Sequence, residues 1–204
     1  MTGKRWLSFG LCFIVSTYLS VAVALSSPTE SLKPTLNEIM ETIIDPALAG
    51  DDYKAERREK IMLIAKKGFN FTEMSKRVLG KPWKKITQQQ RDHFEVLFTK
   101  LLENAYIGKL EGYSGQKIIY KDERIKGKKA VVSTAVENEG VILPVHYIMM
   151  QYETTWQVYD INIEGVSLIQ NYREQFKSIL RKDKFDGLVK LLEEKNSSFN
   201  GEDS

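Results

Sequence analysis

The spacing of apolar residues changes period twice along this chain, from helical spacing to alternation and back. Up to Tyr106, apolar residues recur every three or four positions, which is the pattern of helices that bury one face. After Gly115 the pattern alternates, and helical spacing returns at Ser167. Helices, then strands, then helices predict an α+β fold in which the helices pack on one face of a sheet. The length of 204 residues suits one such domain.

Four segments carry the alternating pattern. They are Lys117–Asp122, Lys129–Glu137, Val141–Tyr152 and Thr155–Ile163. The connections between the last three segments are short and polar, which predicts a four-stranded antiparallel meander.

Residues that cap helices indicate where several of them begin. Thr87 and Gln90 form a capping-box pattern ahead of the longest periodic stretch. Ser167 is placed to cap the first helix after the strands, and Thr72 to cap a short earlier one. No periodicity follows Asn196, so residues 196–204 are expected to form a flexible tail.

The first 24 residues have the pattern of a secretory signal peptide. Lys4 and Arg5 precede the apolar stretch Leu7–Val23, and Ala22–Ala24 supplies a small-x-small cleavage pattern. Cleavage after Ala24 would leave an exported, soluble domain over residues 25–195. The alternative is an uncleaved membrane anchor, since the apolar stretch approaches the length that spans a bilayer.

The charge balance argues against a nucleic-acid partner. Thirty Lys and Arg against 27 Asp and Glu give a net charge of +3, and loss of two basic residues with the signal peptide lowers it to +1. A nucleic-acid binder needs a clear positive excess on one face. The single cysteine, Cys12, lies in the signal peptide, so the mature chain has no thiol chemistry and no Cys-ligated metal.

Known catalytic motifs are missing from the sequence. It contains no HExxH, GxSxG, P-loop, GxGxxG or EF-hand pattern, and it has only two histidines, His93 and His146. We therefore expect no catalytic residue, no metal site and no cofactor.

The segment Val141–Tyr152 is apolar on both of its faces. Its odd positions are apolar from Val141 to Met149, but Ile142, Ile148 and Met150 at even positions are apolar too. A strand with one face in water should alternate. Either helices cover both faces of a central strand, or one face borders an internal apolar cavity. The adjacent methionines suit an adaptable cavity wall.

Four segments resemble one family of proteins. They are Phe69–Gly80 followed by Trp83, then Thr87–Tyr106, then Trp156–Leu168, then Asn171–Phe176. These segments are similar to signatures of the Mla-type periplasmic phospholipid-binding proteins, also called toluene-tolerance auxiliary proteins. The likeness extends in the right order over nearly all of the mature chain. Asn70 and Ser75 depart from it, where the family usually has Asp and Ala.

The resemblance implies a fold and a role. The fold would be α+β, with helices wrapped on a four-stranded antiparallel sheet around an apolar cavity, similar in shape to nuclear transport factor 2. The protein would be a monomeric periplasmic carrier of phospholipid. Its partners would be an outer-membrane lipoprotein complex and an inner-membrane ABC transporter with an MCE-domain subunit, and its role would be to maintain outer-membrane lipid asymmetry. Some members of the family are associated with hopanoids, so the lipid could differ.

The wall of such a cavity should consist of apolar residues beyond those that a small core needs. The candidates are Phe69, Phe71, Leu79, Trp83, Phe98, Leu101, Val145, Tyr147, Met149 and Trp156. A competing hypothesis is an enzyme of similar shape with Asp160, His146 or Tyr106 in a buried polar pocket. A third is an adaptor that binds partner proteins without a ligand.

Overall fold

The computed structural model describes residues 26–112, 115–138 and 140–202, so the expected signal peptide lies outside the described residues. Short 3-10 turns at Pro46–Leu48, Asp51–Tyr53 and Lys81–Lys84 join some of the helices. Within the described part, no helix combines the length and the apolar character needed to cross a bilayer. The helices are α1 (Pro28–Ile43), α2 (Lys54–Gly68), α3 (Phe71–Leu79), α4 (Gln88–Glu111), α5 (Leu168–Lys182) and α6 (Lys184–Glu202).

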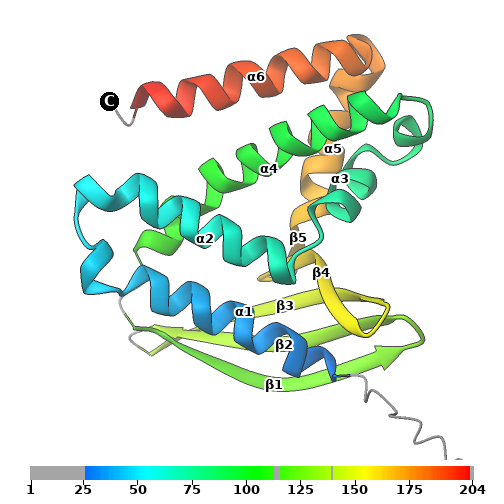
Figure 1. Ribbon diagram of the computed structural model, residues 1–204. Coiled ribbons are helices and arrows are strands. Elements are labelled where there is room, and N and C mark those ends of the chain that lie inside the picture. Colours follow the sequence, from blue (N-terminus) through cyan, green and yellow to red (C-terminus); the bar gives the residue numbers. More distant parts are fainter. Residues whose placement is uncertain (1–25, 113–114, 139, 203–204) are drawn as a thin grey trace, which may run out of the picture.

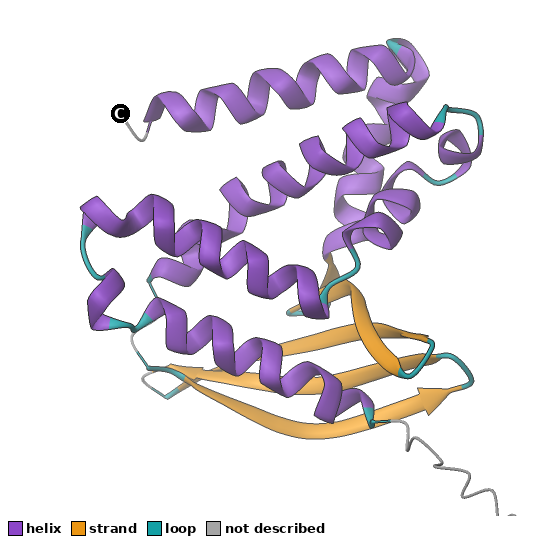
Figure 2. Cartoon of the chain, viewed as in Figure 1, coloured by secondary structure: helices purple, strands orange, loops and turns teal. Residues whose placement is uncertain are grey.

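The strands form the antiparallel meander that alternation predicts, with one addition. Neighbours in sequence are neighbours in the sheet, in the order β1-β2-β3-β4-β5. Figure 2 shows the strands gathered on one side of the molecule, below the helices. The addition is β5, which pairs with the end of β4 after a turn at Glu164 and Gly165, both with positive φ. The strands are β1 (Lys117–Lys126), β2 (Lys129–Asn138), β3 (Val141–Tyr152), β4 (Thr155–Ile163) and β5 (Val166–Ser167).

The described helices all lie on one side of this sheet (Figure 1), as the order of the elements predicts, so the alternative in which helices cover both faces of the central strand is wrong. Odd positions of β3 face the helices: Val145 is 6% exposed. Even positions face the other side, where Ile142 is 57% exposed. The apolar residues at even positions therefore form an open outer face rather than a second buried layer.

Several helix ends follow from the capping residues. The Gln90 amide N–H donates to Thr87 Oγ1 at 3.2 Å, and the Thr87 amide N–H donates to Gln90 Oε1 at 3.0 Å, which completes the capping box. The short helix α3 begins earlier than expected, because Asn70 rather than Thr72 caps it. Asn70 Oδ1 accepts from the Glu73 amide at 2.7 Å, while Asn70 Nδ2 donates to Gln157 of β4 at 2.8 Å.

Helix α6 continues to Glu202, where the sequence predicts a flexible tail from residue 196. Asn196 is buried against α4, and its Nδ2 donates to the carbonyl oxygen of Leu97 at 3.0 Å. A polar residue in a stretch without apolar periodicity thus supplies a tertiary contact that periodicity does not detect.

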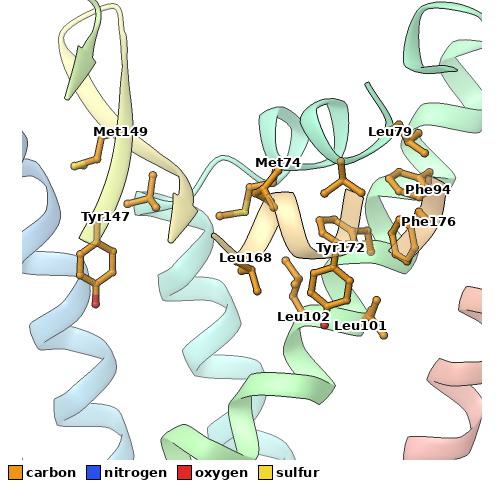
Figure 3. Packing of buried hydrophobic residues seen from close by; sticks show 14 of the residues in the cluster. Met74, Leu79, Phe94, Leu101, Leu102, Tyr147, Met149, Leu168, Tyr172 and Phe176 are labelled. Carbon is orange, nitrogen blue, oxygen red and sulfur yellow. The ribbon is translucent and has the colours of Figure 1, made fainter. Parts of the chain in front are cut away.

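The main core extends from the inner face of the sheet and α1 to α3, α4, α5 and α6. Phe94, Phe98, Tyr172 and Phe176 form an aromatic group with ring centroids 5.5–6.5 Å apart. Figure 3 shows Phe94, Tyr172 and Phe176 of this group apart from Tyr147 on the sheet. Because α4 packs mainly on α6 and α3 and only marginally on the sheet, a space is left between α4 and the sheet.

Candidate functional site: a cavity between the sheet and the helices

A cavity of about 760 Å³ occupies the space between α4 and the inner face of the sheet. Helices α1 and α2 close it on one side, and the start of α3 contributes to its end. Its sheet wall consists of Ile118, Val136, Val141, Leu143, Val145, Tyr147, Ile161 and Ile163. Its helix wall consists chiefly of Ile39, Met40, Ile61, Met62, Ala65, Met74, Leu102, Tyr106, Ile107 and Leu168.

Strand parity places the sheet residues in the wall. Leu143, Val145 and Tyr147 occupy every second position of β3, so their side chains lie on the same face of the sheet. On β4, Ile163 pairs with Val145 and Ile161 pairs with Tyr147, and both lie on that face too. The pairing of β3 with β4 shifts register between Ile148 and Met149. Met149 does not line the cavity but is fully buried in the packed core.

Few polar groups interrupt this apolar wall. They belong to Glu103, Tyr106, Gln116, Tyr147 and Glu164. Burial raises the pKa of Tyr147 well above its usual range. Burial also raises the pKa of Tyr106, although its hydrogen bond with Tyr172 acts in the opposite direction. Both phenols are therefore uncharged at neutral pH.

Four of the ten candidates for the cavity wall line this cavity: Phe69, Phe71, Val145 and Tyr147. The other six lie in the packed core, where neighbouring side chains cover them. They are Leu79, Trp83, Phe98, Leu101, Met149 and Trp156. Trp83 is 8% exposed, with the Arg91 guanidinium 5.5 Å from its ring centroid and Arg91 Nε donating to its carbonyl oxygen at 3.0 Å.

The α1 and α2 part of the wall was missed by the sequence candidates. Ile39 and Met40 on α1, and Ile61 and Ala65 on α2, have helical spacing, which correctly marks a face that is turned inward. Periodicity does not distinguish a face packed on a neighbour from a face that lines a space.

The groups of the competing enzyme hypothesis do not meet in the cavity. Tyr106 lines it, but Asp160 caps α5: its Oδ1 accepts from the Ile169 amide at 3.0 Å. His146 lies at an even position of β3, on the outer face, in register with Ser133. In the part of the chain that the structure describes, no cluster of three or more His, Cys, Asp or Glu could hold a metal ion.

An α+β domain with a largely apolar cavity between its sheet and its helices is a protein built to hold an apolar ligand. The chain belongs to the MlaC protein family, whose model matches residues 33–194.

Relatives agree with this assignment over most of their length. The chain is 24% identical to the intermembrane phospholipid transport system binding protein MlaC of Haemophilus influenzae, covering 95% of this chain and 94% of that protein. It is 22% identical to the toluene tolerance protein ttg2D of Pseudomonas putida, covering 85% and 82%. A solved phospholipid-binding protein of Ralstonia solanacearum, in complex with a phospholipid, superposes with a TM-score of 0.76 at 25% identity, covering 86% and 99%.

Proposed function

We propose that this protein is a phospholipid carrier that holds acyl tails in the cavity between its sheet and its helices. The observation that carries the proposal is the cavity itself: about 760 Å³ lined almost entirely by apolar side chains. The similar fold of the Ralstonia solanacearum protein, solved with a phospholipid, supports the choice of ligand.

The physics of acyl chains requires such a container. Keeping one CH₂ group in water costs about 0.8 kcal/mol, so a chain of about sixteen carbons costs on the order of 13 kcal/mol. Free diffusion of a phospholipid through water is therefore negligible. Binding sites for small molecules commonly enclose roughly 300–1,000 Å³ and are mostly apolar, which describes this cavity.

The carrier would act in the periplasm after loss of residues 1–24. It would move phospholipid between an outer-membrane lipoprotein complex and an inner-membrane ABC transporter with an MCE-domain subunit, and so maintain outer-membrane lipid asymmetry. The name of the Haemophilus influenzae relative, which places that protein in an intermembrane phospholipid transport system, supports this role. Carriage needs no bond to be made or broken, so the proposal assigns no catalytic residue.

Organic extraction of the purified mature protein tests the proposal. We expect the extract to contain phospholipid in a stoichiometric ratio to protein, measured as lipid phosphorus and by mass spectrometry. A stoichiometric hopanoid without phosphorus would replace phospholipid as the cargo. Protein that is purified without lipid and turns over an ester substrate would contradict the carrier and favour the enzyme.

A further inference from the structure

Basic side chains gather at one end of the molecule. Two segments form this end: residues 71–92, which comprise α3, the 3-10 turn after it and the start of α4, and residues 168–184, which comprise α5 and its junction with α6. We call these two segments the basic end. Together they hold eleven Lys and Arg but four Asp and Glu, whereas the rest of the chain after Ala24 holds 17 and 23. The small net charge of the mature chain therefore hides a strong separation of charge.

The fold brings the two segments of the basic end together. Helix α3 packs on α5, and a Cβ atom added to Gly80 would lie 3.2 Å from Nη2 of Arg173. Near the start of α4, the ring centroid of Phe94 lies 6.5 Å from that of Phe176 on α5. Figure 1 shows α3, the start of α4 and α5 at the same end of the molecule. Charges from both segments therefore act on the same surroundings.

Four cations of the basic end are exposed and unpaired. The side chains of Lys81, Lys84, Lys85 and Arg173 form no hydrogen bond or ion pair with any residue that the structure describes. Three of the four carboxylates at this end, by contrast, already bind neighbouring side chains. They are Glu73, which binds Lys76 and Arg77, Glu174, which binds Lys177, and Asp92, which binds Gln88. The positive charge of the basic end is therefore open to a negatively charged partner.

The composition of the basic end favours a lipid surface over a protein as that partner. Seven of its eleven cations are lysines, and lysine is depleted in protein interfaces, where aromatic side chains supply much of the binding energy. Its one tryptophan, Trp83, is 8% exposed, and the exposed large apolar residues of the described chain all lie in other segments. Exposed lysines without an apolar anchor suit the diffuse negative charge of an anionic membrane.

We propose that the basic end is a docking surface for bilayers that contain anionic phospholipid. This inference rests on the proposed function, because a carrier that collects and delivers phospholipid has to reach a bilayer. Complementary charge raises the rate of encounter more than the affinity, and salt weakens it. Binding of this kind lets the protein leave the membrane again, as a carrier must.

Cosedimentation of the mature chain with vesicles tests the docking surface. One set of vesicles contains phosphatidylethanolamine with phosphatidylglycerol, and the other contains phosphatidylcholine alone. We expect binding to the first set at about 0.05 M salt and its loss at about 0.5 M salt, with no binding to the second set. Equal binding to both sets, or binding that salt leaves unchanged, would overturn the proposal.

Lipid phosphorus in the same preparations separates this proposal from the carrier function. Protein that carries phospholipid but does not bind the anionic vesicles would overturn the docking surface and leave the carrier function intact. The basic end would then face an acidic protein surface instead. Protein that carries no phospholipid would overturn the carrier function itself.

Two triple charge reversals separate the position of the charge from its amount. The basic-end variant combines Lys81→Glu, Lys84→Glu and Lys85→Glu. The control variant makes the same change in net charge at the exposed turn between β1 and β2, and it combines Lys126→Glu, Lys128→Glu and Lys129→Glu. We expect the basic-end variant to bind the anionic vesicles on the order of 100-fold more weakly. The control variant should keep most of the binding, and equal losses in two folded variants would overturn the proposal.

Fluorescent labels on single cysteines show which face of the molecule meets the bilayer. The mature chain has no cysteine, so each label is unique. Gln89→Cys places a label at the exposed start of α4, and Ile142→Cys places one on the outer face of the sheet, where the side chain is 57% exposed. We expect energy transfer to an acceptor lipid in the anionic vesicles to be stronger from residue 89. Equal or stronger transfer from residue 142 would overturn the proposal.

Discussion

The Ser167 hydroxyl donates a hydrogen bond of 2.6 Å to Oδ2 of Asp160, and this bond ties strand β4 to the start of α5. The other carboxylate oxygen of Asp160 accepts from the Ile169 amide at 3.0 Å, and Ser167 Oγ accepts from the Gln170 amide at 3.0 Å. Two amide groups at the start of α5 are thereby satisfied. The first residue of α5, Leu168, lines the cavity, so this junction positions part of the cavity wall.

Asp160→Asn should lower stability without loss of lipid. The asparagine keeps one acceptor, but its amide nitrogen cannot accept the Ser167 hydroxyl, and the negative charge near the start of α5 is lost. We expect a loss of about 1 kcal/mol in the free energy of unfolding, measured by urea denaturation. Loss of lipid at unchanged stability would instead indicate a role for Asp160 in binding.

Gly68→Ala should destabilise the protein, because α1 and α2 approach closely at this glycine. A Cβ atom at residue 68 would lie 2.5 Å from Thr35 Oγ1 and 2.9 Å from Thr35 Cβ. We expect a loss of about 1–3 kcal/mol, typical of overpacking. Gly108→Ala is the matched control, because it lies in α4 with nothing within 4 Å of its added Cβ, and it should gain up to about 1 kcal/mol. If both substitutions change the free energy of unfolding by the same amount in urea denaturation, then α1 and α2 can move apart at residue 68 without loss of stability, which would contradict this prediction.

The pKa of Asp122, on the outer face of the sheet, should depend on its hydrogen bond with Ser133. A hydrogen bond from Ser133 holds the pKa of Asp122 below its usual range, and the nearby Arg124 acts in the same direction. A lowered pKa favours the folded state above the ordinary aspartate pKa, and this contribution is lost as the pH falls through the lowered value. Ser133→Ala should raise the pKa of Asp122, which carboxyl-carbon NMR titration measures directly. An unchanged pKa would assign the shift to Arg124.

Most of the fold could be predicted from the sequence because periodicity reports which side of an element is buried. The change to alternation correctly placed four strands and the meander, and the capping residues placed the starts of α4 and α5. The continuation of α6 beyond residue 196 was not predicted, because it is supported by the buried side-chain amide of Asn196 through a contact with α4. That contact joins residues 99 positions apart and has no local pattern.

The cavity could be predicted only in part, because the walls of a cavity and of a packed core use the same residue types. Val145 and Met149 stand at the same parity on β3, yet Val145 lines the cavity and Met149 is covered on all sides. What separates them is which part of the sheet the helices cover: α1, α2, α3 and α5 contact β4, whereas α4 packs on α6 and α3 and leaves part of the sheet uncovered. This arrangement depends on tertiary packing and not on the local sequence of β3.

Val145→Asp and Ile142→Asp form a matched pair that tests the cavity as the lipid site. Both residues lie on β3, but Val145 lines the cavity and Ile142 lies on the open outer face. A carboxylate at residue 145 would face the acyl chains without a partner, which is strongly disfavoured. At residue 142 it would lie opposite Glu137 of β2, so a small loss of stability is expected there.

Lipid phosphorus per chain, measured after organic extraction of both folded variants and of the unmodified protein, is the most direct test of the carrier account. Circular dichroism and thermal melting establish that each variant is folded before extraction. We predict that Ile142→Asp carries as much lipid phosphorus as the unmodified protein and that Val145→Asp carries almost none. Folded Val145→Asp with undiminished lipid phosphorus would contradict the account, because the acyl chains would then lie outside the cavity.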